Sequence, residues 1–210
     1  MIFIPFGCLI FSVIIHELAH GYMALRLGDS TARDRGRLSF NPIKHLDPMG
    51  SVLIPGLLMI SGAPFLLGWA KPVPVDTSNF KSPVKDMMFV ALAGPMSNLF
   101  IGFTSLLVYS VFMNNGFFEQ NIQFYRLSTN VVAYFFQLNI YLAVFNLLPI
   151  PPLDGSRILA FFLSREYQAK LYRLEQYGFL IIFLLATFDM LSPIVTILSY
   201  PLIGLARYLF

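Results

Sequence analysis

Long apolar segments separated by short polar stretches follow one another along the chain. The first extends from Pro5 to Leu27, and others cover residues 49–67, 87–113, 129–148 and 177–210. A helix needs about 20 apolar residues to cross a bilayer, and several of these segments are long enough. The pattern predicts an all-α polytopic membrane protein with about five to six membrane helices.

Two of these segments contain residues that break helices. The 49–67 segment holds two prolines and three glycines, so we expect a re-entrant element that enters and leaves on the same side of the membrane. The 177–210 segment is interrupted at residues 189–193, which predicts a helical hairpin with Asp189 in a turn at the outer interface. An acid in an apolar region can instead mark an ion path.

The polar stretches predict smaller elements. Residues 29–47 include the alternating segment Gly36–Phe40, which favours a small β-hairpin directly after the first helix. Residues 156–175 have the pattern of an amphipathic helix at the membrane surface. No polar stretch is large enough for a soluble domain, so we expect a single membrane-embedded domain over residues 1–210.

The composition also indicates a membrane protein, and the distribution of charge predicts the orientation of its helices. The chain is 57% hydrophobic and 12% charged, whereas about a quarter of the residues in a soluble domain are charged. Lys and Arg number five in residues 26–47, three in 68–86, four in 157–175 and one in 114–128. Basic loops stay in the cytoplasm, so the net charge of +3 indicates topology and not a nucleic-acid partner. The single cysteine, Cys8, cannot form an internal disulfide and is expected to be a buried thiol.

The candidate chemistry lies in the first apolar segment, in the sequence HELAH. His16 and His20 are four residues apart, a spacing that places both imidazoles on one face of a helix, where they can bind one zinc ion. Glu17 is suited to deprotonating a water molecule there. Ionisable residues within a membrane span are rare and usually functional, so the sequence predicts a metal site.

A catalytic zinc site needs a third protein ligand from elsewhere in the chain. The two best candidates are His45 and Asp154, and Asp47, Glu166 and Glu175 come behind them. Asp154 follows a segment that returns to the same side of the membrane as His20. It could also be a turn residue that caps the next helix.

Two distant motifs resemble the site-2 protease family of intramembrane zinc metalloproteases. His16–His20 is similar to the first half of that family's active site, and Asn146–Gly155 (NLLPIPPLDG) resembles the second half. Similar segments lie between them, at residues 41–48, 68–75 and 93–98. The 114–128 loop is too short for an inserted PDZ or CBS domain, so the resemblance is to compact members.

The resemblance implies that Asp154 is the third ligand of one zinc ion and that Asn146 lies close to the metal. Glu17 would then be the general base, and Asn146 could donate a hydrogen bond to the developing oxyanion. Asn146 could instead bond another helix, and we expect Asn98 to serve packing. For His45 we expect a backbone-bonded loop anchor. Residues 36–40 could pair with an extended substrate, or form a surface loop.

The predicted function is hydrolysis of peptide bonds in or near transmembrane segments of other proteins, as in regulated intramembrane proteolysis. The resemblance implies a multi-pass protein of a bacterial plasma membrane, with its active site toward the cytoplasm and its partners a transmembrane substrate and the lipid bilayer. Two alternatives stay open: a quality-control membrane metalloprotease of another class, with Glu166 or Glu175 as ligand, and a non-enzymatic zinc carrier.

Overall fold

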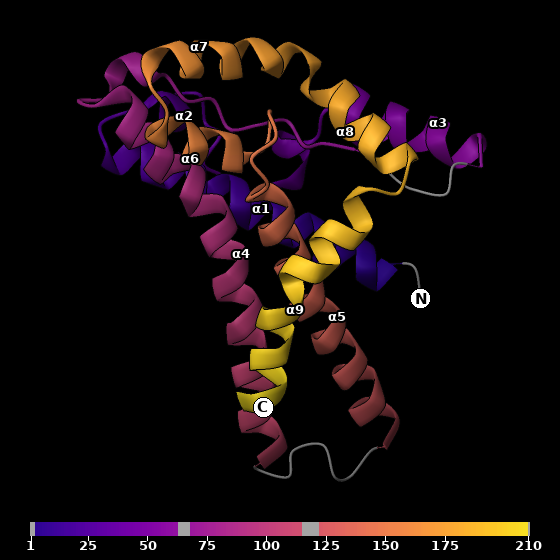
Figure 1. Ribbon diagram of the computed structural model, residues 1–210. Helices are drawn as coiled ribbons and strands as arrows, with labels where there is room; N and C mark the ends of the chain where they lie inside the picture. Colours follow the sequence, from indigo (N-terminus) through magenta and orange to yellow (C-terminus); the bar gives the residue numbers. More distant parts are fainter. Residues whose placement is uncertain (1–2, 63–67, 115–121, 210) are drawn as a thin grey trace.

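Helices make up all the regular secondary structure in the part of the chain that the computed structural model describes, residues 3–62, 68–114 and 122–209 (Figure 1). The α-helices are α1 (Phe3–Arg26), α2 (Thr31–Asp34), α3 (Ile54–Ile60), α4 (Pro83–Asn114), α5 (Ile122–Asn146), α6 (Asp154–Phe162), α7 (Arg165–Leu174), α8 (Gly178–Thr187) and α9 (Leu191–Leu209). Short 3-10 or π turns are η1 (Pro42–His45), η2 (Pro48–Leu53), η3 (Thr77–Asn79) and η4 (Glu175–Tyr177).

Three helices are long and apolar enough to cross a membrane: α1, α4 and α5. A fourth span is reached only if residues 165–187 and 191–206, which meet at an angle of 87°, count together as one. The described residues therefore do not confirm the predicted five to six membrane helices. The 49–67 segment forms η2 and α3, which follow each other without a break but are too short to cross a membrane. Residues 63–67 of this segment lie outside the described ranges, as do residues 115–121 of the predicted polar loop.

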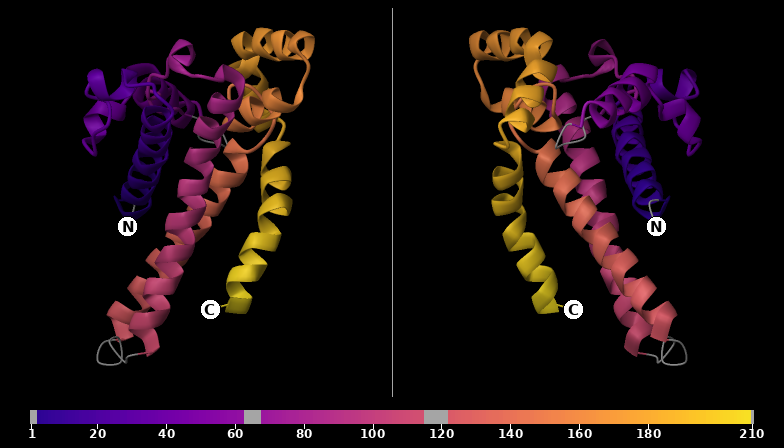
Figure 2. Two further views of the ribbon diagram at one scale, coloured as in Figure 1. Left: turned by 90° about the vertical axis from the view of Figure 1, so that its left-hand side faces the viewer. Right: turned by 90° about the vertical axis from the view of Figure 1, so that its right-hand side faces the viewer.

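Helix α4 is the centre of the bundle, since it packs against α1, α5 and α6. Helix α9 lies along α5, and their contact buries an apolar cluster that includes Phe136, Ile140, Val144 and Ala206. The C-terminal ends of α1 and α5 and the N-terminal end of α4 come together at one end of the molecule (Figures 1 and 2). This end also carries α2, α6 and α7, and all functional candidates lie there.

Glycine ends the first helix, as its position predicted. Gly28 adopts φ +110°, and its N–H and that of Asp29 donate to the carbonyls of Leu25 and Ala24. These two bonds define a Schellman motif, in which a left-handed residue satisfies the last carbonyls of a helix. The chain is thereby turned sharply into the polar stretch that begins at residue 29.

The predicted β-hairpin over residues 36–40 is wrong. Gly36 has φ +62° and closes α2 in a second Schellman motif, in which Gly36 N–H bonds Arg33 and Arg37 N–H bonds Ala32. The carbonyl of Ser39 binds the imidazole of His45. Because these backbone groups are used for capping and for anchoring, they do not form a ladder, and the described part of the chain contains no strand.

The C-terminal apolar region also differs from the prediction. Asp189 has φ +49° and caps α8, with its own N–H on Ala186 and that of Met190 on Leu185. Leu191 packs with Leu148, close to the start of α6. The corner between α8 and α9 therefore lies at the end that carries the functional candidates, and not at the opposite interface. From this corner α9 runs toward the far ends of α4 and α5 (Figure 2).

The predicted amphipathic helix over residues 156–175 is two helices, α6 and α7, which meet at Leu163 and Ser164. For residues 49–67 the sequence predicts a re-entrant element, and the structure shows one backbone contact across this segment. Trp69 N–H donates to the Gly50 carbonyl over 3.1 Å, so the chain that leaves through η2 and α3 comes back to where it started.

Candidate metal centre

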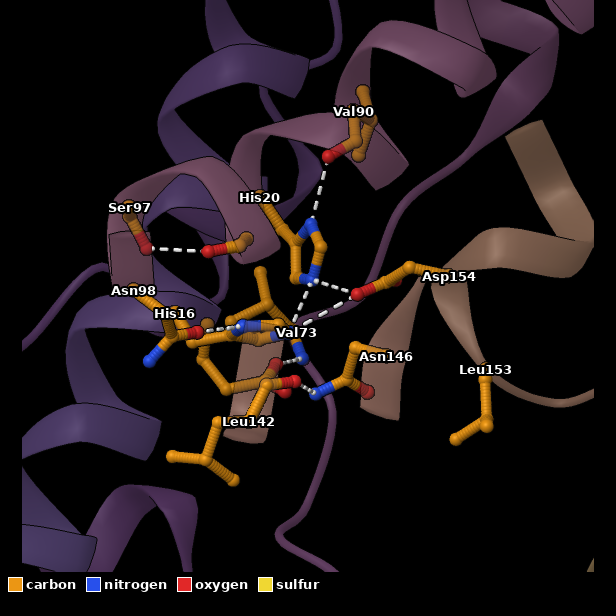
Figure 3. Close-up of polar contacts among 12 residues, drawn as sticks. His16, His20, Val73, Val90, Ser97, Asn98, Leu142, Asn146, Leu153 and Asp154 are labelled. Atoms are coloured by element: carbon orange, nitrogen blue, oxygen red, sulfur yellow. Dashed lines mark hydrogen bonds and ion pairs between the residues drawn. The ribbon is translucent and has the colours of Figure 1, made fainter. Parts of the chain in front are cut away.

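Three side chains from two distant segments converge on one point. The Nε2 atoms of His16 and His20 are 3.0 Å apart, and Oδ2 of Asp154 lies 3.1 Å from the first and 3.4 Å from the second (Figure 3). Within the described residues this is the one group of three or more His, Cys, Asp or Glu side chains placed to hold a metal ion. Of the ligand candidates in the sequence, the structure brings these three together.

Local structure explains how Asp154 reaches the histidines. Asp154 is the first residue of α6, directly after the proline-rich turn that follows α5, and Leu153 before it takes the N-cap position. Gly155 allows α6 to start against the end of α5, because a Cβ there would lie 2.1 Å from the Leu147 carbonyl oxygen. The N-cap position considered for Asp154 is thus taken by Leu153, and the Asp154 carboxylate points at the imidazoles.

The other nitrogen of each imidazole is held by an oxygen. Nδ1 of His16 bonds Oδ1 of Asn98, and Nδ1 of His20 bonds the Val90 carbonyl over 2.7 Å. A carbonyl oxygen only accepts, so each Nδ1 carries the proton and each Nε2 presents a lone pair. Oδ2 of Asp154 is buried and has no hydrogen-bond donor among the described groups. Three acceptors therefore face one another at 3.0–3.4 Å, an arrangement that a cation between them would stabilise.

Zinc fits both the ligand types and the spacing. Zinc binds imidazole nitrogen and carboxylate oxygen at about 2.0–2.1 Å in tetrahedral geometry, which sets neighbouring ligand atoms about 3.3 Å apart. The observed separations of 3.0, 3.1 and 3.4 Å are close to that edge length. Three protein ligands are also the number that leaves a coordination position free for chemistry.

Glu17 lies beside this cluster without belonging to it. Its Oε2 accepts a 2.7 Å hydrogen bond from the backbone N–H of Val73. Val73 belongs to an extended segment, residues 68–76, that we call the strap. Alternate strap residues donate inward: Trp69 to Gly50, Lys71 to His45 and Val73 to Glu17. The strap thus passes over α1 and holds the Glu17 carboxylate in place.

A buried carboxylate fixes the far end of the strap. Asp29 is fully buried and accepts bonds from the N–H of Asp76, from the Asn79 amide, and from the N–H and hydroxyl of Thr31. Burial acts to raise the pKa of Asp29, but these hydrogen bonds outweigh it and leave the pKa below the ordinary value of 3.8. The strap is therefore tied to the end of α1 by an ionised acid.

Gly94 lets α4 approach the imidazoles. A Cβ at this position would lie 2.5 Å from Cε1 and Nε2 of His20 and 2.6 Å from Cε1 of His16. No real Cβ makes such contacts, so any larger residue would push the rings away from Asp154. The glycine is part of what allows the cluster to form.

Asn146 lies close to Asp154, on the last turn of α5 (Figure 3). Its Nδ2 donates one hydrogen to the Leu142 carbonyl of its own helix over 2.9 Å. An amide nitrogen has two hydrogens, so a second donor is left. No bond from Asn146 to another helix is found among the described residues, in contrast to the helix–helix alternative considered from the sequence.

The remaining ligand candidates lie elsewhere. His45 is buried and its Nε2 bonds the Ser39 carbonyl over 2.7 Å, as expected of a loop anchor. Glu166 is paired with Lys170, and Glu175 with Arg157. Asp47 caps η2 through the N–H groups of Met49 and Gly50, and Cys8 lies two turns before His16 on α1.

Sequence reasoning missed several groups around the site. Asn98 touches His16, although packing was expected for it, and Asn139 on α5 bonds Asn98. Each of these two apolar helices contains an amide side chain, and a buried amide is costly unless it has a hydrogen-bond partner, so the sequence could have indicated this pair. The Val90 carbonyl and the Val73 N–H have no such signal, because any residue supplies a backbone group.

The chain is similar to one known protein family and to several named proteins. The model of peptidase family M50 matches residues 116–188. YwhC of Bacillus subtilis, which is named as a zinc metalloprotease, is 40% identical over 205 residues, covering 95% of this chain and 85% of its own. Rip2 of Mycolicibacterium smegmatis and MJ0392 of Methanocaldococcus jannaschii, also named as zinc metalloproteases, are 32% and 28% identical.

Those two matches cover 83% and 77% of this chain, but only 62% and 35% of the relatives themselves. No solved structure matches the chain. The similarity to YwhC extends over nearly the whole of both proteins, which local resemblance of a motif would not produce. The chain therefore belongs to peptidase family M50, the site-2 protease family of zinc metalloproteases.

Proposed function

We propose that this metalloprotease is an intramembrane endopeptidase, which hydrolyses peptide bonds in or near transmembrane segments of other membrane proteins. One observation carries the proposal: two of the three converging ligand atoms belong to α1, a helix long and apolar enough to cross a membrane. A peptide bond must reach this cluster to be cut. Its substrate is therefore a membrane protein, as in regulated intramembrane proteolysis.

We assign zinc to His16, His20 and Asp154. When bound, zinc supplies a Lewis acid that lowers the pKa of a water ligand and polarises the scissile carbonyl. The two histidines present lone pairs because their Nδ1 protons are held by Asn98 and Val90. The buried carboxylate of Asp154 contributes the negative charge that completes the ligand set.

Glu17 acts as the general base in this assignment. It follows His16 directly on α1, so its carboxylate lies next to the ligands without joining them. The Val73 N–H holds one of its oxygens and leaves the other available to take a proton from the attacking water. Glu17 later passes this proton to the leaving amine.

Asn146 stabilises the oxyanion that develops on the substrate carbonyl. Its second Nδ2 hydrogen is not used by the Leu142 carbonyl, and its position beside Asp154 suits such a contact. Loss of a single oxyanion donor typically costs about 3–4 kcal/mol of transition-state stabilisation. A helical substrate has its carbonyls bonded internally, so the segment that binds here must be at least partly extended.

The topology that fits this function places the cluster toward the cytoplasm of a bacterial cell, with residues 1–210 forming one domain in the plasma membrane. The segments with most Lys and Arg, residues 26–47, 68–86 and 157–175, are at the end of the bundle that holds the cluster. Basic segments remain on the cytoplasmic side. The alternative in which Glu166 or Glu175 is the ligand is not favoured, since both are paired with cations elsewhere.

A membrane-tethered reporter tests the proposal. The purified protein, in liposomes with zinc, is given two reporters that carry the same cleavable sequence, one inside a transmembrane segment and one in a soluble linker. We expect cleavage of the first, no cleavage with Glu17→Gln or Asp154→Asn, and little cleavage of the second. Cleavage of the soluble linker alone would contradict the intramembrane assignment.

A further inference from the structure

A chain of buried polar side chains links three membrane helices behind His16. His16 on α1 is 8% exposed, and Asn98 on α4 and Asn139 on α5 are fully buried. The Asn98 amide bonds His16 on one side and, over 2.8 Å, Asn139 on the other. Amides in the interior of apolar helices are costly unless bonded, and here each amide is bonded to its neighbour in the chain.

The orientation of each amide in this chain is determined by its neighbours. Asn139 Nδ2 lies 2.8 Å from the carbonyl oxygen of Phe135, which only accepts, so Asn139 must turn its Oδ1 toward Asn98. Asn98 then presents Nδ2 to Asn139, and this same nitrogen is 3.5 Å from the Ser12 carbonyl. The Oδ1 of Asn98 is thereby left facing His16.

The consequence reaches the metal ligand. An acceptor at Nδ1 of His16 places the imidazole proton there and leaves the lone pair on Nε2, the atom 3.1 Å from Asp154. A reversed Asn98 amide would present a donor to Nδ1, favour the other tautomer and put a proton where the metal belongs. His20 does not have this weakness, because its Nδ1 bonds a backbone carbonyl that cannot reverse.

We propose that Asn139 is a positioning residue of the zinc site, which acts through Asn98 to hold His16 in the tautomer that binds metal. The inference rests on the proposed ligand set, but not on the substrate or on cleavage. Outer partners of metal-bound histidines typically change metal affinity 10- to 100-fold when they are lost. Asn139 is one hydrogen bond further from the metal than Asn98, so we expect its loss to lower zinc affinity on the order of 10-fold.

The test measures zinc affinity by competition with a chromogenic chelator in detergent-purified protein. Asn139→Leu removes the acceptor, keeps the branched shape and the number of heavy atoms of the side chain, and is expected to weaken zinc binding about 10-fold. Ser199→Ala is the matched control: Ser199 is also fully buried in a helix, but its hydroxyl donates to the Val195 carbonyl of the same helix. The control is expected to leave zinc affinity unchanged.

The same substitution in a second variant, Asn98→Asp, distinguishes a positioning role of Asn139 from a role in helix packing. In Asn98→Asp both oxygens of the ionised side chain are acceptors, so no reversal can offer His16 a donor. Asn139→Leu should therefore cost little zinc affinity in the Asn98→Asp background, and the visible absorption bands of the cobalt-substituted double variant should match those of Asn98→Asp. Asn139→Ala replaces Asn139→Leu if that variant does not fold.

Equal losses in both backgrounds would mean that Asn139 only packs the helices, and would overturn the proposal. Unchanged zinc affinity in Asn139→Leu would overturn it as well. Because the readout is metal binding, failure of the reporter cleavage would leave this inference standing, and the reverse also holds.

Discussion

The carboxylate of Glu17 is joined to the backbone N–H of Val73 by a 2.7 Å hydrogen bond between segments 56 residues apart. One partner follows His16, a proposed metal ligand on α1, and the other belongs to the strap. The bond holds the proposed base beside the metal ligands, and it connects the sequence motif HELAH to a segment whose role the motif does not reveal.

Glu17→Gln should slow cleavage strongly while zinc stays bound. The glutamine oxygen can still accept from Val73, so the strap keeps its place, but the amide cannot take a proton from water. We expect a loss of about 100- to 10,000-fold in cleavage rate, as for other general bases. Reporter cleavage and zinc content of the same preparation measure both effects, and a variant that cuts at the normal rate would exclude Glu17 as the base.

Asp154→Asn should weaken zinc binding by more than about 100-fold, beyond the range typical of outer partners. The amide keeps the size of the side chain but loses the charge that faces the two imidazoles. His45→Ala serves as the control, because His45 bonds the Ser39 carbonyl away from the cluster. Loss of zinc in His45→Ala with retention in Asp154→Asn would reverse the ligand assignment.

Removal of zinc by a chelator should stop cleavage without unfolding the protein. Helix α1, which carries both histidines, is held to α4 by apolar packing around Ala24 and Val90, and α6, which carries Asp154, also packs against α4. Circular dichroism should therefore change little on chelation, and added zinc should restore cleavage. Loss of helicity on chelation would show that the metal is needed for the fold.

Gly94→Ala should damage the metal site without harming the helix. The added Cβ would lie 2.5 Å from the His20 ring, so the imidazoles must move. Alanine in a helix is otherwise better than glycine by up to about 1 kcal/mol. We expect zinc affinity to fall about 10- to 100-fold while the Tm of the zinc-free protein is unchanged or higher.

Gly204→Ala, on α9, is the control for that experiment, since a Cβ there would meet nothing within 4 Å. Equal zinc affinity in both alanine variants would show that the imidazoles tolerate the added methyl group, against the close approach described above.

Asp29 should make the thermal stability of the protein depend on pH in the acidic range. Its folded pKa lies below the ordinary 3.8, so its stabilising effect is complete above that value and is lost as the pH falls toward the folded pKa. Asp29→Asn should lower the Tm at neutral pH and flatten its dependence between about pH 5 and pH 3. An unchanged slope in the variant would mean that other carboxylates cause the acid sensitivity.

Patterns in the sequence predicted what depends on periodicity and spacing. The apolar run around HELAH forms α1 and ends at Gly28, and the four-residue spacing of His16 and His20 places their Nε2 atoms 3.0 Å apart. The alternation over residues 36–40 predicts a strand that does not form, because Gly36 is in a left-handed conformation and the backbone at this point caps α2. A period of two predicts a strand only where the backbone is free to pair.

Local sequence patterns do not predict hydrogen bonds between distant residues or contacts made by backbone groups. Nothing local indicates that the Val90 carbonyl bonds His20 or that the Val73 N–H bonds Glu17, since every residue offers those groups. The corner at Asp189 illustrates the same limit. The sequence predicts a turn at the outer interface there, but in the structure Leu191, the first residue of α9, lies in one apolar cluster with Leu148.

X-ray absorption at the zinc K edge, on the purified protein loaded with one zinc ion per chain, tests the ligand set most directly. The account predicts two imidazole ligands with the remaining positions filled by oxygen at about 2.0–2.2 Å, and loss of an oxygen ligand in Asp154→Ala. Three imidazoles would place His45 at the metal, and a sulfur neighbour at about 2.3 Å would place Cys8 there. Either result would contradict a zinc centre built from His16, His20 and Asp154.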